Sequence, residues 1–73
     1  MNPAEEIMKK ADRLADEAAW KYRAFGICRD FMGISRTAWL LYQDWHRLPA
    51  KKREEKLEKL RQEMDRLEKM IRR

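Results

Sequence analysis

The stretch from residue 27 to residue 48, ICRDFMGISRTAWLLYQDWHRL, carries two overlapping apolar patterns that predict different structures. The first alternates steps of four and three, which is the spacing of one face of a long amphipathic helix. It comprises Ile27, Phe31, Ile34, Ala38, Leu41, Trp45 and Leu48. The second is typical of two short helices that meet at an angle and bury a shared corner at Gly33-Ile34-Ser35. It comprises Cys28, Met32, Ile34, Trp39 and Tyr42.

The size of the chain limits how it can be stabilised. At 73 residues it forms one small domain, 1–73, and such a chain buries only about 60% of its unfolded surface. Cys28 is the only cysteine, and no cluster of Cys or His has the spacing of metal ligands, so neither a disulfide nor a metal is expected. Three Trp, five Met, two Tyr and two Phe are many for so small a core. We therefore expect a protein partner or self-association as a homo-oligomer.

The first twenty residues carry acids and bases throughout, which is not the pattern of a signal peptide. No apolar run approaches the ~20 residues of a membrane span. A single cysteine fits a reducing compartment. These observations predict a cytoplasmic protein that does not enter a membrane.

Start and stop signals divide the chain into helices. Asn2 and Pro3 suit a helix start, Gly26 suits a helix end, and Pro49 ends one helix and opens the next. The expected helices are 3–25, 27–47 and 50–72. The fold class is therefore all-α, a small three-helix bundle, or a four-helix bundle if the middle helix breaks at Gly33.

The last predicted helix has a heptad pattern like that of a coiled coil, with charged residues elsewhere. Its apolar positions are Leu57, Leu60, Met64, Leu67 and Ile71. About two and a half heptads are short for an independent coiled coil. The helix is therefore expected either to fold back on the other helices or to pair with a second copy.

The net charge of +5 is concentrated in residues 51–73, which hold ten basic and six acidic residues. Basic clusters lie at both ends of this segment, at 51–53 and 72–73. They suit either a polyanion or an ordinary solvated helix.

Catalytic chemistry is not expected. His46 is the only histidine, and neither Asp44 nor Cys28 forms a nucleophile or acid–base constellation with it by spacing. There is no glycine-rich phosphate loop. We expect no enzyme activity, no cofactor, no metal and no small-molecule substrate.

Residues 31–39, FMGISRTAW, resemble the helix-turn-helix of insertion-sequence transposases and of phage terminase small subunits, and the similar segment covers 27–46. In those families an apolar residue, a Gly-Ile/Val-Ser-Arg run and an aromatic residue bracket the turn. The resemblance implies that Gly33 takes a left-handed turn, Ile34 fills the corner and Ser35 caps the second helix.

The resemblance implies a small, non-catalytic DNA-binding protein of phage or mobile-element type. Arg36, Thr37 and Gln43 would face the groove of double-stranded DNA. Lys51, Lys52 and Arg53 would bind phosphates.

The alternative is a helical protein–protein interaction module. Trp and Arg are enriched at the energetic centres of interfaces, and Trp20 lies off the apolar face of its helix. The predicted interface comprises Trp20, Trp39, Trp45, Leu57, Leu60, Met64, Leu67 and Ile71. The default interpretation of the three tryptophans is that they fill the core, and the alternative is that one or two of them anchor the interface. The small, charged format is similar to that of phage-encoded inhibitors of host defence proteins. The backbone at residues 33–35 distinguishes the two functions, since only DNA reading requires a turn there.

Overall fold

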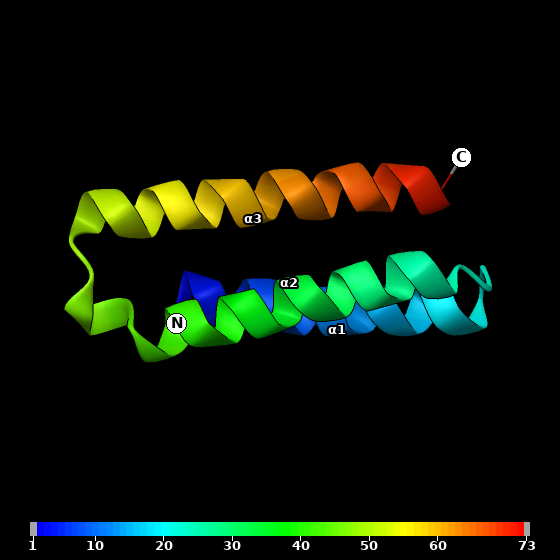
Figure 1. Ribbon diagram of the computed structural model, residues 1–73, viewed down its shortest axis with the longest axis horizontal. Coiled ribbons are helices and arrows are strands. Elements are labelled where there is room, and N and C mark those ends of the chain that lie inside the picture. Colours follow the sequence, from blue (N-terminus) through cyan, green and yellow to red (C-terminus); the bar gives the residue numbers. More distant parts are fainter. Residues whose placement is uncertain (1, 73) are drawn as a thin grey trace.

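The protein is an all-α bundle of three helices, described here by a computed structural model that covers residues 2–72 (Figure 1). Its elements are α1 (Pro3–Trp20), α2 (Phe25–Gln43), the short 3-10 helix η1 (Trp45–Arg47) and α3 (Ala50–Ile71). The three-helix prediction is confirmed.

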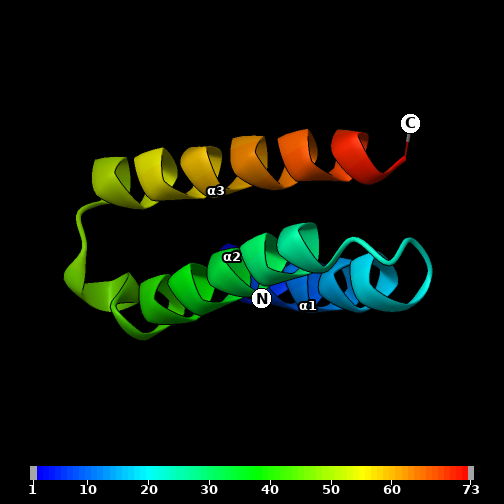
Figure 2. The ribbon, with the colours of Figure 1, turned by 45° about the vertical axis from the view of Figure 1, so that its right-hand side comes forward.

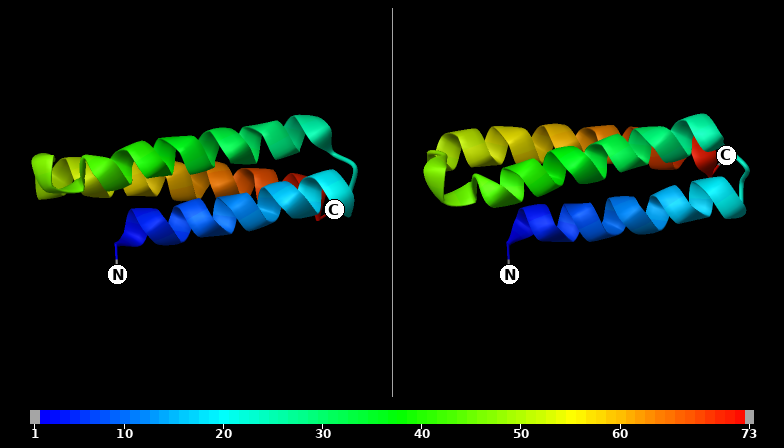
Figure 3. Two further views of the ribbon diagram at one scale, coloured as in Figure 1. Left: turned by 90° about the horizontal axis from the view of Figure 1, so that it is seen from below. Right: turned by 60° about the horizontal axis from the view of Figure 1, so that its bottom comes forward.

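The helices lie side by side along a rod of 38 × 19 × 18 Å. α1 and α2 form an antiparallel pair, and α3 turns back at η1 to run antiparallel to α2 (Figures 2 and 3). The contact between α1 and α2 is the most extensive of the three. Small buried residues of α1, among them Ala11, Ala15 and Ala18, let the two backbones approach closely.

The start of α1 follows the prediction. Asn2 is in an extended conformation, and its side-chain oxygen accepts a hydrogen bond from the Ala4 N–H at 2.8 Å. Pro3 occupies the first helical position, where its missing N–H costs nothing. Glu5 forms an ion pair with Lys9 at 3.3 Å.

The predicted end of the first helix at residue 25, with Gly26 as its stop, is wrong. α1 ends at Trp20, and Arg23 adopts the left-handed conformation, with φ 55°. The Ala24 N–H then donates to the Ala18 carbonyl at 2.7 Å, which closes the turn. Tyr22 and Phe25 continue the apolar spacing of α1 but stay exposed. A longer helix would therefore gain no stability from burying these two side chains.

α2 runs through Gly33 without a break, which overturns both the left-handed turn that the resemblance implies at this glycine and the four-helix alternative. Neither Gly26 nor Gly33 has a positive φ. The Thr37 hydroxyl donates to the Gly33 carbonyl at 3.0 Å, four residues back, as it can only within a helix. One continuous helix buries Phe31, Ile34, Ala38 and Leu41 on a single face. That burial outweighs the ~1 kcal/mol that an internal glycine costs.

The structure therefore follows the pattern of alternating steps of four and three, which predicts one long helix, although α2 ends at Gln43 instead of residue 47. The next residues tighten into η1, and Leu48 takes an extended conformation before Pro49, as expected of a residue that precedes proline. Trp45 and Leu48 still pack against the core, half-buried.

α3 folds back on the other two helices. Its five heptad positions are all buried, and Leu57 and Leu67 are among the least exposed large side chains. Ion pairs join it to α1, from Lys10 to Glu68 at 3.7 Å and from Arg72 to Glu17 at 3.2 Å. Within residues 2–72, no helix has the length and apolar character that crossing a bilayer requires.

Candidate functional site

Three large apolar side chains are exposed in one line along α2. Phe25, Met32 and Trp39 are 65%, 59% and 46% exposed. They are seven residues apart, which is close to two helical turns, so they lie on the same face. This face is opposite the one that packs into the core.

Polar residues alternate with these three side chains at steps of four and three. They are Arg29, Arg36 and Gln43, all exposed. We call the combined row, Phe25, Arg29, Met32, Arg36, Trp39 and Gln43, the outer stripe. Neither arginine of the outer stripe forms an ion pair with any residue in 2–72. The stripe contains no acid, so it is both apolar and cationic.

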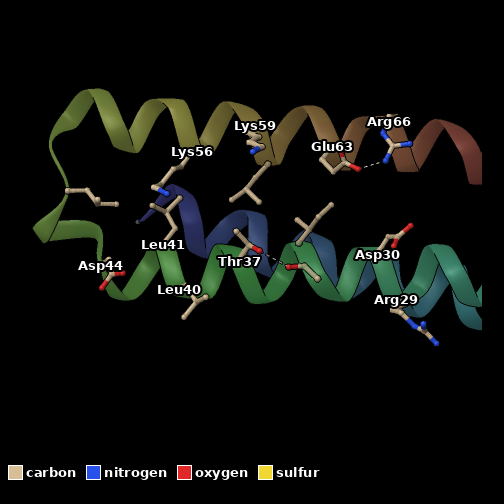
Figure 4. Close-up of a pocket in the computed structure, with 14 residues that line it drawn as sticks. Arg29, Asp30, Thr37, Leu40, Leu41, Asp44, Lys56, Lys59, Glu63 and Arg66 are labelled. Carbon is tan, nitrogen blue, oxygen red and sulfur yellow. Dashed lines mark hydrogen bonds and ion pairs between the residues drawn. The ribbon is translucent and has the colours of Figure 1, made fainter.

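A groove of about 730 Å³ lies beside the outer stripe, between α2 and α3 (Figure 4). Ile34, Leu41 and Leu60 form its apolar floor, and Leu40, 47% exposed, lies at its α2 edge. Gly33 also lines the groove. A methyl group added at Gly33 would meet no atom within 4 Å, so the space beside it is open.

The acids of the groove are next to arginines. Glu63 accepts a hydrogen bond from Arg66, and this bond lowers the pKa of Glu63. The same bond raises the pKa of Arg66, and the charge of Asp30 raises it further. Asp44 lies 3.9 Å from Arg47.

The lysines of the groove are not hydrogen-bonded to an acid, although the charge of Lys59 also lowers the pKa of Glu63. Lys56 and Lys59 project from α3, and Figure 4 shows Lys56 reaching toward Leu41 on α2. Neither ammonium forms an ion pair in the described part of the chain. The α3 edge of the groove therefore presents two positive charges above an apolar floor.

The structure divides the residues predicted to contact DNA between different surfaces. Arg36 and Gln43 belong to the outer stripe, with Trp39 between them. Thr37 lines the groove, and its hydroxyl already donates to the backbone of α2. Ser35, the expected cap of a second helix, is half-buried inside α2.

The predicted phosphate-binding residues at the start of α3 differ in environment. Lys51 is exposed, and Lys52 lies 3.8 Å from Glu55. Arg53 donates through Nε to the Trp45 carbonyl at 2.6 Å, and its guanidinium lies 5.1 Å from the centre of the Trp45 ring. This contact joins η1 to α3. Sequence reasoning missed it, because the eight-residue separation spans two different elements.

The residues predicted to contact a partner are also divided. Trp20 and Trp39 are exposed, and Trp20 is 78% exposed at the end of α1. The five heptad residues of α3 are instead buried in the core of the same chain, so they form no free surface. Phe25, Met32 and Leu40 were missed, although the seven-residue spacing of Phe25, Met32 and Trp39 was visible in the sequence.

No group of three or more His, Cys, Asp or Glu residues within 2–72 could hold a metal ion. Cys28 is half-buried beside the core.

No family model, no curated protein and no solved structure matches the chain.

Proposed function

We propose that this protein is a non-catalytic helical interaction module that binds a partner protein through the outer stripe of α2. The observation that carries the proposal is the in-line exposure of Phe25, Met32 and Trp39 on a helix whose opposite face already fills the core. Several large apolar side chains exposed on one helix face are typical of an interaction surface, whereas single exposed apolar residues are common everywhere.

The charge of the outer stripe favours a partner with acidic residues. Tryptophan and arginine provide much of the binding energy at protein interfaces, and the stripe alternates apolar residues with arginine. An antiparallel second copy of α2 centred on Met32 would bring Arg29 of one copy beside Arg36 of the other. Like charges at such a distance oppose pairing, so a different, acidic protein fits this surface better.

DNA binding has less support as the function. The resemblance to a helix-turn-helix requires a turn at Gly33, and α2 is continuous there. Arg36 lies between Met32 and Trp39, so the face that would enter a DNA groove carries large apolar side chains. Of the three basic residues 51–53, Arg53 is engaged with Trp45.

The test compares two double variants that each remove one methionine and one tryptophan. Met32→Gln with Trp39→Gln alters the outer stripe, and Trp20→Gln with Met70→Gln alters exposed positions elsewhere. A partner captured from cells of the source organism is identified, purified and titrated against each protein by calorimetry. We expect the stripe variant to bind about tenfold or more weakly and the control to match the parent.

Two results would contradict the proposal. One is equal loss of affinity in both double variants. The other is salt-dependent binding of duplex DNA, measured by fluorescence anisotropy, that Arg36→Gln abolishes while the stripe variant still retains the captured protein.

A further inference from the structure

We propose that the groove between α2 and α3 receives an acidic amphipathic helix of the partner. This inference rests on the proposed function and specifies the structural element that the partner contributes. In the complex, four helices would then lie side by side, the fourth being supplied by the partner.

The shape of the groove suits a helix. Its lining follows α2 from Arg29 to Asp44, which is about four helical turns or ~22 Å. Its two walls are antiparallel helices, and an apolar floor lies between them. Amphipathic helices bind in such grooves with their apolar face inward. Leu40 and the aliphatic stem of Lys56 offer apolar contacts at the two edges.

Gly33 gives the strongest indication that something occupies the groove. A glycine inside a helix costs about 1 kcal/mol relative to alanine. Nothing within the described chain requires it, because an added Cβ would meet no atom within 4 Å. A residue without a side chain does allow a partner helix to approach the backbone of α2 closely. We therefore assign the space beside Gly33 to the partner.

The charges on the α3 side of the groove specify a helix with an acidic flank. Lys56 and Lys59 stand on the α3 side, and neither forms an ion pair with a described residue, whereas Glu63 is bonded to Arg66. The α2 side carries Asp30 and Asp44, and Figure 4 shows the Arg29 side chain directed away from the groove. A helix in the groove would thus face unpaired cations on its α3 flank, and Glu or Asp on that flank would complement them.

The experiment uses a synthetic helix as the probe. A peptide of about 18 residues, ~27 Å long as a helix, has leucine on one face and glutamate on the flank that would lie against α3. A second peptide has the same composition in an order without an apolar face. Calorimetry measures the binding of each peptide to the whole protein, and we expect only the amphipathic one to bind.

Three variants of the protein locate the site. Lys56→Gln with Lys59→Gln should weaken binding of the amphipathic peptide about tenfold. Lys51→Gln with Lys52→Gln removes the same charge from the same helix and should leave binding nearly unchanged. Gly33→Met should fill the groove and abolish binding while raising the thermal midpoint, because methionine is the better helix former. A loss of binding in a more stable protein is not explained by unfolding.

Several outcomes would overturn the groove assignment. They are equal binding of both peptides, equal effects of the two lysine pairs, and unchanged binding in Gly33→Met. If Gly33→Met still binds the captured partner while the outer-stripe variant does not, the groove assignment fails and the proposed function stands. If only the groove variants lose that partner, the outer stripe is the wrong surface. Self-association that Gly33→Met abolishes would show a second copy in the groove.

Discussion

Gly33 is the residue at which the two interpretations of the sequence diverge. Glycine is common in turns because it adopts positive φ without strain, and this property supports the resemblance to a helix-turn-helix. In the structure its φ is ordinary, and the Thr37 hydroxyl bonds to its carbonyl across one helical turn. Glycine permits both conformations, so its presence alone did not decide between them.

Replacing Gly33 by alanine provides a direct test of the continuous helix. Gly33→Ala should raise the free energy of unfolding by about 1 kcal/mol and the thermal midpoint by roughly 4–8 °C. The gain comes from helix propensity, since the new methyl group meets no neighbour. Thermal unfolding followed by circular dichroism measures it.

Gly26→Ala is the comparison variant, because Gly26 is only the second residue of α2 and should gain less. A marked decrease in the midpoint of Gly33→Ala would contradict the continuous helix. That result is the one expected of a left-handed turn at this position.

Arg23 holds the left-handed conformation that the sequence led us to expect at a glycine. This conformation costs a non-glycine residue about 1–2 kcal/mol. The side chain is exposed, and no local pattern marks the residue. The turn instead lies where the rest of the bundle no longer covers the side chains of α1.

Arg23→Gly should therefore stabilise the protein, by about 1 kcal/mol once the added flexibility of the unfolded chain is deducted. Urea unfolding measures the change. Lys21→Gly is the matched control, because Lys21 has a helical φ and ψ and should lose stability on the same replacement. Equal effects of the two variants would show that Arg23 is not strained.

At the scale of the elements, the sequence predicts helix interiors well and helix ends poorly. The four-three pattern from Ile27 to Leu41 and the heptads of α3 correspond to buried faces. The ends of α1 and α2 were each placed several residues too far along the chain. Local spacing continues past both ends. Beyond α1, Tyr22 and Phe25 stay exposed, whereas beyond α2, Trp45 and Leu48 still pack against the core from η1 and from extended backbone. Only the tertiary structure defines these limits.

The contact between η1 and α3 should contribute measurably to stability. Arg53→Ala removes the hydrogen bond to the Trp45 carbonyl and the cation–π contact with its ring. We expect a loss of about 1–2 kcal/mol in the free energy of unfolding, from urea titration. Arg61→Ala changes an exposed arginine of the same helix and should stay within ~0.5 kcal/mol of the parent. If both variants unfold alike, the contact contributes little.

At the scale of the whole molecule, the heptad residues of α3 complete the core of their own chain. Leu67→Ala should cost about 2–5 kcal/mol, because this side chain is 1% exposed. The unfolding midpoint should also be independent of protein concentration, as expected when folding requires no second copy. Calorimetry over a wide concentration range checks this prediction. A midpoint that rises with concentration would restore the oligomer that the heptads also allow.

The candidate site was predictable only in part. Trp39 and Arg36 were both singled out by the sequence, but for different functions and on different surfaces. Placing them on one face required knowing that α2 is continuous, because a break at Gly33 would change which residues share a face. The groove was not predictable at all, since it depends on how α3 lies against α2.

The three tryptophans occupy different surroundings, and this gives the protein a built-in optical reporter. The indoles of Trp20 and Trp39 are open to water, whereas that of Trp45 is half-buried beside Arg53. A partner that covers the outer stripe would exclude water from the Trp39 ring and shift its fluorescence emission to shorter wavelength. Trp20, on another helix, would keep its emission unchanged. In a Trp20→Phe variant, the wavelength of the fluorescence maximum would report occupancy of the outer stripe without any attached dye.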